Sequence, residues 1–165
     1  MSGPDVRRLR RVAVLGLGAS GLAVVRLLRM KGVDVNVRDE GTAAKVQTAA
    51  ETARGLGAFV RLGPGELDLG DVRDFDLGII SPGMDPRVGI PREVFDARIP
   101  IWSEIELGYR FCECPIVAVT GTNGKTTTTE LIDAVMRAGG KRSLASGNIG
   151  FALCDAVEQS AKLDV

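Results

Sequence analysis

Hydrophobic and polar positions along the chain follow two periods, and the changes of period divide the sequence into short elements. Runs of continuous or alternating apolar residues predict β-strands at 11–15, 33–39, 58–62, 75–80 and 115–119. Apolar residues spaced three and four positions apart predict helices at 22–32, 42–54, 92–98, 125–138 and 151–161. Strands that alternate with helices in this order predict an α/β fold with parallel sheets.

The end of the chain carries less regular patterns. Residues 141–150 (KRSLASGNIG) indicate a strand followed by a glycine loop, and 163–165 (LDV) indicate the start of another strand. A fold seldom ends on an opening core strand, so we expect the sequence to be part of a longer protein. The composition changes around residues 102–113, which places a domain boundary near Ser103.

Composition narrows the classes of function. The chain has 165 residues, 45% of them hydrophobic, and its 21 Lys and Arg balance 21 Asp and Glu. A neutral chain without a basic run argues against nucleic-acid binding. No apolar stretch is long enough to span a membrane, and residues 1–11 lack the apolar region of a signal peptide. We therefore expect a cytoplasmic protein that binds neither membranes nor nucleic acid.

Histidine is absent from the whole sequence, which excludes a Ser-His-Asp triad and any histidine metal ligand. A metal would need oxygen ligands, and these favour Mg²⁺ over Zn²⁺. Cys112, Cys114 and Cys154 are expected as reduced thiols, and one C-x-C pair is a weak signal for a metal.

The most informative stretch is VAVTGTNGKTTTTE, residues 117–130, where a predicted strand, a glycine loop and a predicted helix follow one another. Closely spaced backbone N–H groups and a helix N-terminus bind phosphate, a lysine reaches the β- and γ-phosphates, and the next hydroxyl ligates Mg²⁺. The loop differs from G-x-x-x-x-G-K-[ST] because Val119 stands at the first glycine position and Gly121 follows later. The alternative is a strand–turn–helix unit in which G-K-T is accidental.

A second glycine loop, GLGASG at 16–21, also lies between a predicted strand and a predicted helix. In a dinucleotide fingerprint Gly16 forms the turn, Gly18 allows a phosphate to approach, and Gly21 allows close packing of helix on strand. Asp39 lies 18 residues beyond Gly21, where such folds bind a ribose hydroxyl. The motif indicates a bound nucleotide without identifying it as NAD, and a glycine turn needed only for packing is the alternative.

A Rossmann-like first domain followed by GTNGKTT resembles the Mur ligases of peptidoglycan synthesis, and GLGASG, SPGM and GNIG together are most similar to the D-glutamate-adding branch. The resemblance implies a Rossmann-like, parallel-sheet UDP-sugar-binding domain at 1–103. It also implies the beginning of a P-loop ATPase-type central domain at 104–165. The implied whole protein is a monomeric ATP-dependent ligase that joins D-glutamate to UDP-N-acetylmuramoyl-L-alanine through an acyl phosphate.

The resemblance also implies roles for individual residues. Lys125 is the catalytic lysine on the β- and γ-phosphates, and Thr126 ligates Mg²⁺. The implied ATP-binding residues are Gly121, Thr122, Asn123, Gly124, Lys125, Thr126 and Thr127. The implied residues for the UDP substrate are Gly18, Ala19, Ser20, Asp39, Glu40, Gly83 and Asn148. Glu40 and Gly41 stand where a known member has threonine and arginine, which puts an arginine contact to uracil in question.

Several alternatives stay open. The family's further metal ligands and its D-glutamate site are expected beyond residue 165, so this chain alone is expected to be inactive. An NAD-dependent oxidoreductase would use GLGASG but leaves GTNGKTT unexplained, and a non-enzymatic nucleotide-binding module would use both loops. Ser81, Pro82 and Gly83 could form only a turn, and Asn148 could be only a loop residue. Trp102 is expected to pack at the domain junction, and Glu104 and Glu106 to face solvent.

Overall fold

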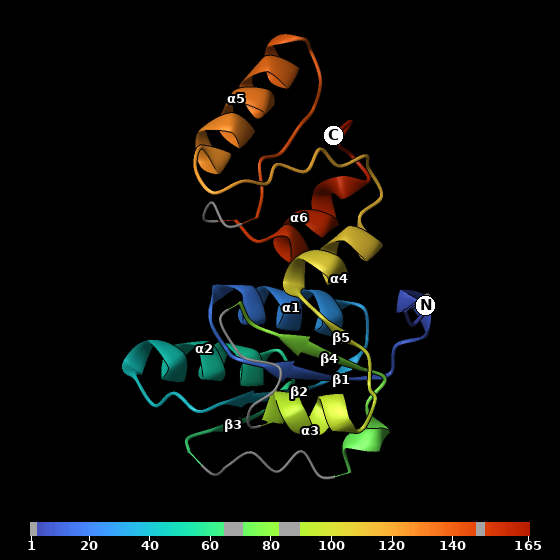
Figure 1. Cartoon of the computed structure of the whole chain (residues 1–165), viewed down its shortest axis with the longest axis vertical. Coiled ribbons are helices and arrows are strands. Elements are labelled where there is room, and N and C mark those ends of the chain that lie inside the picture. The colour runs from blue at the N-terminus through green and yellow to red at the C-terminus, as the bar shows by residue number, and fades with distance from the viewer. Residues whose placement is uncertain (1–2, 65–70, 83–89, 148–150) are drawn as a thin grey trace.

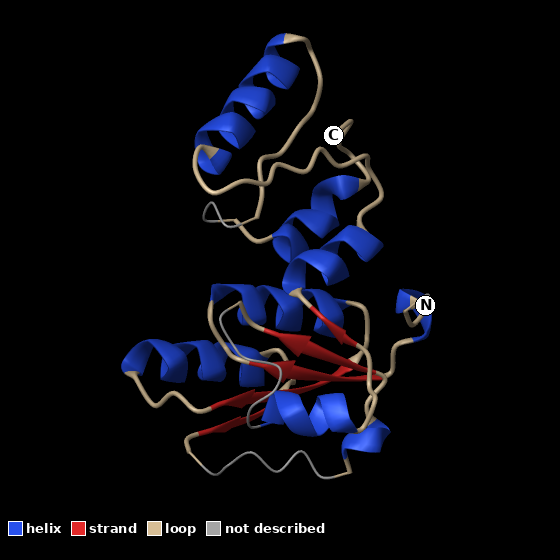
Figure 2. Ribbon diagram, viewed as in Figure 1, coloured by secondary structure: helices blue, strands red, loops and turns tan. Residues whose placement is uncertain are grey.

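The computed structural model describes residues 3–64, 71–82, 90–147 and 151–165 (Figure 1). Its first part is a parallel sheet between helices, and its second part consists of helices and extended loops (Figure 2). The α/β fold class predicted from the alternating pattern is confirmed.

The sheet has five parallel strands in the order β3-β2-β1-β4-β5. The strands are β1 (Arg11–Leu15), β2 (Asp34–Asp39), β3 (Phe59–Leu62), β4 (Leu77–Ile80) and β5 (Ile101–Trp102). The helices among them are α1 (Ala19–Met30), α2 (Ala44–Gly55) and α3 (Ile90–Asp96), with 3-10 turns η1 (Val6–Arg8) and η2 (Val72–Asp74). Apolar periodicity did not predict β5, because two residues are too few to show a period.

The central strand β1 is buried on both faces, as expected for a parallel sheet covered by helices. Val12 and Val14 belong to the larger core beneath α1 and α2, whereas Ala13 and Leu15 belong to a smaller core beside α3. These two cores explain why β1 reads as a continuous apolar run rather than an alternating one.

Three helices follow the sheet: α4 (Glu104–Phe111), α5 (Lys125–Ala138) and α6 (Leu153–Ser160). The helix α6 packs against α1 and α4, and α5 stands farther from the sheet (Figure 1). A Cβ added to Gly108 of α4 would lie 2.8 Å from Cγ of Leu153, so this glycine allows α4 and α6 to approach closely.

The expectation that Glu104 faces solvent is wrong. Its side chain is buried, and Oε1 accepts a 2.6 Å hydrogen bond from the backbone N–H of Cys154 at the start of α6. The carboxylate satisfies an N–H group that the helix itself leaves without an acceptor, and this compensates for its burial. Glu106 is half-buried and pairs with Arg110 at 2.6 Å.

The strands predicted at 115–119 and after residue 141 are also wrong for the described part of the chain, which has no strand beyond β5. Val117 is 50% exposed and makes no ladder. A parallel strand forms only when neighbouring strands supply hydrogen-bond partners. The nearest approach to pairing joins Asp164 N to Arg142 O at 2.8 Å, so two expected strand segments already lie side by side.

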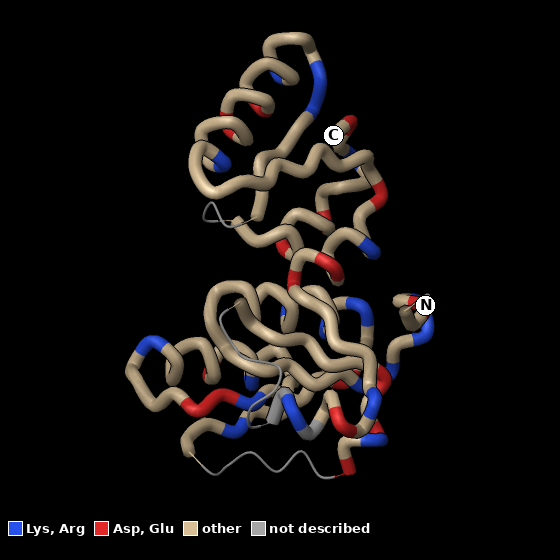
Figure 3. The backbone as a smooth tube through the Cα atoms, viewed as in Figure 1, with Lys and Arg blue, Asp and Glu red and all other residues tan. Residues whose placement is uncertain are grey.

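Charged residues and helix lengths describe the remaining general features of the chain. In Figure 3, basic and acidic residues both occur in the sheet-containing part and in the helical part of the described chain. Within the described residues, no helix is both long and apolar enough to cross a bilayer.

Candidate functional site: two glycine loops

The first glycine loop lies where the strand order of the sheet reverses. β1 has β2 on one side and β4 on the other, and the chain reaches them through separate crossovers. Residues 16–18 follow β1, and residues 81–82 follow β4. In open α/β sheets, ligands bind at this switch point, outside the carboxyl ends of the strands.

Each glycine of this loop has a distinct geometric role. Gly16 has φ 93°, a conformation that favours glycine. A Cβ on Gly21 would lie 2.1 Å from the carbonyl oxygen of Gly16, so the predicted close packing of helix on strand is confirmed. Gly18, the N-cap of α1, has φ −76°, and a Cβ there would meet nothing within 4 Å. The backbone conformation and packing at position 18 therefore do not require glycine, and the space beside its Cα is open to a ligand.

Ala19 and Ser20 form the first turn of α1, where backbone N–H groups point out of the helix. Ala19 is exposed and Ser20 is half-buried. Gly18, Ala19 and Ser20 thus lie together at a helix N-terminus, which is a favourable place for phosphate.

Asp39 ends β2 and fixes the loop. Its Oδ2 accepts a 2.5 Å hydrogen bond from the N–H of Leu17, and its Oδ1 accepts a 2.7 Å bond from the N–H of Gly41. The hydroxyl of Ser81 donates to the carbonyl of Gly16 at 3.1 Å, which ties the end of β4 to the same loop. Sequence reasoning missed both structural roles, because they join residues 22 and 65 positions apart.

Three further residues were predicted to bind the UDP substrate: Glu40, Gly83 and Asn148. Glu40 is exposed and directly follows Asp39 at the end of β2. Gly83 and Asn148 lie outside the described residues, so their roles stay predictions.

The second glycine loop leads into the longest helix of the second part. Gly121 has φ 150° and Gly124 has φ 77°, both in the region that favours glycine. The first backbone bond of α5 runs from Thr128 N to Gly124 O at 2.9 Å. The N–H groups of residues 125–127 therefore have no acceptor within the helix, and all residues from 121 to 127 are exposed. This is the geometry of an anion site at a helix N-terminus.

Lys125 folds back over this loop. Its ammonium group donates to the carbonyl of Gly121, and to that of Thr122 at 3.2 Å. Both acceptors are exposed backbone groups, so a phosphate at the loop could replace them without leaving a buried group unpaired. The positive charge already lies at the mouth of the loop, where a nucleotide's phosphates would dock.

Thr126 offers an exposed hydroxyl on the first turn of α5. A hydroxyl oxygen is a suitable ligand for Mg²⁺, which otherwise keeps several waters and substrate oxygens. No group of three or more His, Cys, Asp or Glu side chains that could hold a metal occurs among the described residues. Thr126 thus fits Mg²⁺ as one ligand of several, and the chain shows no self-sufficient metal site in its described part.

A cavity of about 380 Å³ opens beside the start of α5. Lys125, Thr126 and Thr129 line it, and so do residues 115–119. Asp133 and Ser143 also reach it and hydrogen-bond to each other at 2.6 Å.

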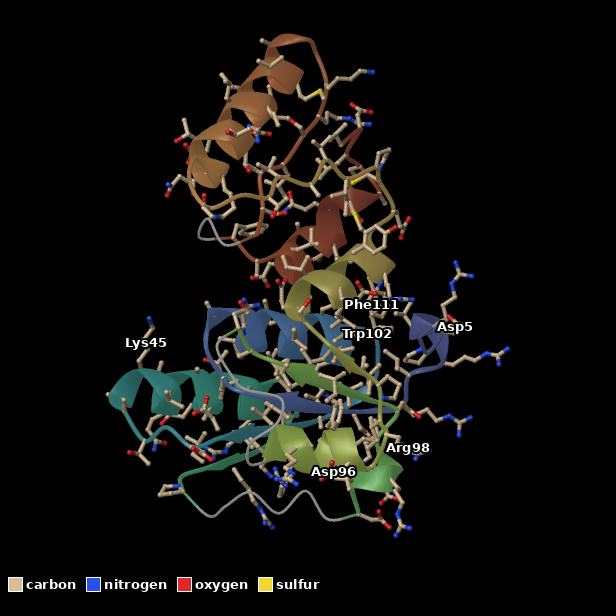
Figure 4. All side chains as sticks on the ribbon, viewed as in Figure 1. Asp5, Lys45, Asp96, Arg98, Trp102 and Phe111 are labelled. Carbon is tan, nitrogen blue, oxygen red and sulfur yellow. The ribbon has the colours of Figure 1, made fainter. Side chains whose placement is uncertain are left out.

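The two parts of the chain are joined by an ion pair and an aromatic contact. Nε and Nη2 of Arg26 on α1 donate to Asp155 on α6 at 2.8 and 2.7 Å, and this pairing raises the pKa of Arg26. Trp102 is buried between the sheet and α4, with Arg110 stacked 4.3 Å from its ring centroid (Figure 4). The expectation that Trp102 packs at the junction is confirmed.

Family models match both parts of the chain. The model for the Mur ligase MurD-like N-terminal domain matches residues 10–103, and the model for the Mur ligase middle domain matches residues 119–162. The first match covers more than half of the chain and contains the loop at the switch point. The second contains the glycine loop that leads into α5.

Curated relatives share the same name. A UDP-N-acetylmuramoylalanine--D-glutamate ligase of Frankia casuarinae is 46% identical over 88% of this chain and 31% of its own. Proteins of that name from Desulfosudis oleivorans and Streptomyces coelicolor are each 36% identical over 94% of this chain and 34% of their own. The chain thus spans about a third of the length of the curated relatives it matches.

Solved structures agree on the fold. The UDP-N-acetylmuramate:L-alanyl-gamma-D-glutamyl-meso-diaminopimelate ligase of Neisseria meningitides matches 84% of this chain and 42% of its own, with a TM-score of 0.55 and 20% identity. A murein peptide ligase of Psychrobacter arcticus matches 79% of this chain and 27% of its own, with a TM-score of 0.52 and 22% identity.

Proposed function

The chain belongs to the Mur ligase family, and from this premise we propose that the whole protein is an ATP-dependent amide ligase of peptidoglycan synthesis. Its substrates are UDP-N-acetylmuramoyl-L-alanine, ATP and D-glutamate. One observation carries the proposal: a single chain presents two glycine loops, each leading into a helix N-terminus, in the order of the two family matches. An NAD-dependent enzyme would account for only the first loop.

The UDP substrate is proposed to lie across the switch point of the first sheet. Gly18, Ala19 and Ser20 would receive its diphosphate at the start of α1. Asp39 and Glu40 lie at the end of β2, where the ribose or uracil would reach. Gly83 and Asn148 complete the proposed set, Gly83 by close approach to uracil and Asn148 as a donor to the diphosphate or sugar.

ATP is proposed to bind the second loop. The backbone of residues 121–127 would surround its phosphates, and Lys125 would turn from the carbonyls of Gly121 and Thr122 to the β- and γ-phosphates. Thr126 would ligate Mg²⁺, which neutralises phosphate charge when bound.

The proposed reaction proceeds in two steps. The carboxylate of the L-alanyl group attacks the γ-phosphorus of ATP, and an acyl phosphate and ADP are formed. The amine of D-glutamate then attacks the acyl carbon, and the tetrahedral intermediate collapses to the amide and phosphate. The contribution of this chain is to position the reactants and to stabilise charge on the transferring group with Lys125.

The proposed division of the chain is a UDP-sugar-binding domain at 1–103 and the start of an ATP-binding domain at 104–165. Two observations support it: the first family match ends at residue 103, and Ser103 caps α4 by accepting a 3.2 Å bond from Glu106 N. Because both nucleotide substrates belong to the cytoplasm, we place the protein there, as a monomer without nucleic-acid or membrane partners.

The test is a parallel thermal-unfolding and calorimetric titration of the 165-residue chain with UDP, UDP-N-acetylmuramoyl-L-alanine, NAD and Mg-ATP. A ligand that binds only the folded state raises the free energy of unfolding by about 2.7 kcal/mol at a concentration of 100 times Kd. Stabilisation by the UDP ligands and not by NAD supports the proposal. Stabilisation by NAD alone refutes the assignment of the first loop.

The ligase reaction itself is tested with a protein that spans the full length of the curated relatives. Multiple-turnover ADP release that depends on both UDP-N-acetylmuramoyl-L-alanine and D-glutamate is the expected result, because the acyl phosphate of one cycle must be consumed before the next. Continuous ADP release without D-glutamate would refute the substrate assignment while leaving the two nucleotide loops in place.

A further inference from the structure

Cys112 and Cys114 form a pair of thiols at the start of the segment that leads to the nucleotide loop. Their Sγ atoms lie 3.5 Å apart, and the structure contains both as free, half-buried cysteines. Cys112 is the C-cap of α4 and has extended backbone angles, φ −67° and ψ 136°. The chain leaves the helix at Cys112, and two positions later the sulfur atom of Cys114 comes into contact with that of Cys112.

The pair is held in place by its surroundings. The N–H of Cys112 donates to Gly108 O at 2.9 Å, and the N–H of Glu113 between the cysteines donates to the hydroxyl of Ser160 at 3.2 Å. These bonds fix the backbone on α4 and α6 rather than leaving the thiols on a free loop.

Both cysteines line the cavity that extends to Lys125. Pro115 follows Cys114 directly and opens the segment 115–119 before the loop. The pair therefore lies on the covalent connection between the helix packed on the first sheet and the nucleotide loop.

We propose that Cys112 and Cys114 are a site of reversible oxidation, where a small disulfide oxidant such as oxidised glutathione converts the two thiols into an intramolecular disulfide. A disulfide bond is about 2.05 Å long, so the sulfur atoms need only a short approach from their contact distance. The third cysteine, Cys154, is buried and takes no part in this reaction.

The proposed exchange has two steps. The thiolate of Cys112 attacks one sulfur of oxidised glutathione, and the first glutathione leaves as a thiolate. The thiolate of Cys114 then attacks the sulfur of Cys112, the mixed disulfide breaks, and the second glutathione leaves. The two glutathione thiolates take up the protons lost by the cysteines, so the protein gives two electrons to the oxidant.

Burial and the neighbouring sulfur of Cys112 raise the pKa of Cys114. The Cys114 thiolate therefore forms at a higher pH than the thiolate of an exposed cysteine. In the second step its target sulfur is already in contact.

Peptide mapping provides a direct test, because trypsin cleaves after Arg110 and Lys125 and leaves both cysteines in peptide 111–125. The folded chain is incubated with oxidised glutathione and then unfolded, and the remaining thiols are alkylated. The tryptic peptides are identified by mass spectrometry. The expected product is peptide 111–125 without alkyl groups and lighter by two hydrogens, restored by dithiothreitol. Cys154 lies in peptide 143–162 and is expected to be alkylated there, as an internal control.

Matched variants separate the pair from general thiol reactivity. Cys112→Ser and Cys114→Ser are each expected to accumulate the glutathione adduct, whereas Cys154→Ser is expected to form the disulfide like the parent chain. Circular dichroism verifies that each variant is folded. Stable glutathione adducts on peptide 111–125 of the parent chain, or disulfides between two chains, would overturn the proposal.

Discussion

The carboxylate of Asp39 accepts a hydrogen bond from the backbone N–H of Leu17 across 2.5 Å, and so the end of β2 holds the glycine loop that follows β1. The second oxygen of the same carboxylate accepts from Gly41 at 2.7 Å. A carboxylate oxygen has two lone pairs, so Asp39 can hold the loop and still accept from a ligand. Its position thus combines support of the loop with a proposed contact to the UDP substrate.

Replacing Asp39 is therefore expected to affect both stability and binding. Asp39→Ala should lower the free energy of unfolding by about 1.5–3 kcal/mol, since it removes two hydrogen bonds to a charged group. It should also abolish the stabilisation by UDP. Urea unfolding with and without UDP measures both effects, and Glu51→Ala, which removes an exposed carboxylate on α2 away from the loop, serves as the control. Equal stability of the Asp39→Ala and Glu51→Ala chains would contradict the role of Asp39 in the loop.

Two of the three glycines of the first loop, Gly18 and Gly21, are expected to differ in how much stability their substitution costs. Gly21→Ala should cost about 3 kcal/mol, because its Cβ would meet the Gly16 carbonyl oxygen at 2.1 Å. Gly18→Ala should cost below about 1 kcal/mol, because its Cβ enters open space.

Binding reverses this ranking. The new methyl group of Gly18→Ala would stand where the diphosphate is proposed to approach, so UDP should no longer raise the melting temperature of this folded variant. Thermal unfolding with a UDP titration measures the result. A Gly18→Ala chain that UDP stabilises as strongly as the parent would contradict the proposed diphosphate position.

Lys125→Ala is expected to weaken Mg-ATP binding at least tenfold, or about 1.4 kcal/mol, and to leave UDP binding unchanged. The stability of the free chain should hardly change, because the ammonium group bonds only to exposed carbonyls of its own loop. Calorimetric titration with Mg-ATP and then UDP provides the measurement. Lys45→Ala, on the exposed face of α2 (Figure 4), is the matched loss of a positive charge. Equal loss of Mg-ATP affinity in both variants would assign the effect to general charge.

The ion pair between Arg26 and Asp155 predicts a measurable coupling between the two parts of the chain. Arg26→Ala, Asp155→Ala and the double variant form a double-mutant cycle, and we expect a coupling energy of about 1 kcal/mol. The two-point geometry favours a value at the upper end for partly exposed pairs, and added salt should reduce it. Urea unfolding at low and high salt gives the cycle. A coupling energy of zero at low salt would show that the pair does not join the parts energetically.

Much of the local structure could be predicted from the sequence because it depends on local chemistry. The first four strands and most helices followed from apolar periodicity to within a few residues. The two glycine loops could be predicted because their turns depend on residues close together in the sequence. Gly16, Gly121 and Gly124 have positive φ, which favours glycine. The exposed start of α5 likewise follows from a glycine loop that opens directly into a helix.

The sequence by itself determined the α/β class, the two glycine loops and the family they indicate, since these depend on patterns among residues close together in the sequence. Only the tertiary structure decided that Asp39 holds Leu17, that Glu104 is buried against Cys154, and that Arg26 meets Asp155. These contacts join residues 22, 50 and 129 positions apart, so the local pattern of apolar and polar residues cannot predict them. The structure also decided against a strand at 115–119, because β-propensity becomes a strand only where neighbouring strands complete its hydrogen bonds.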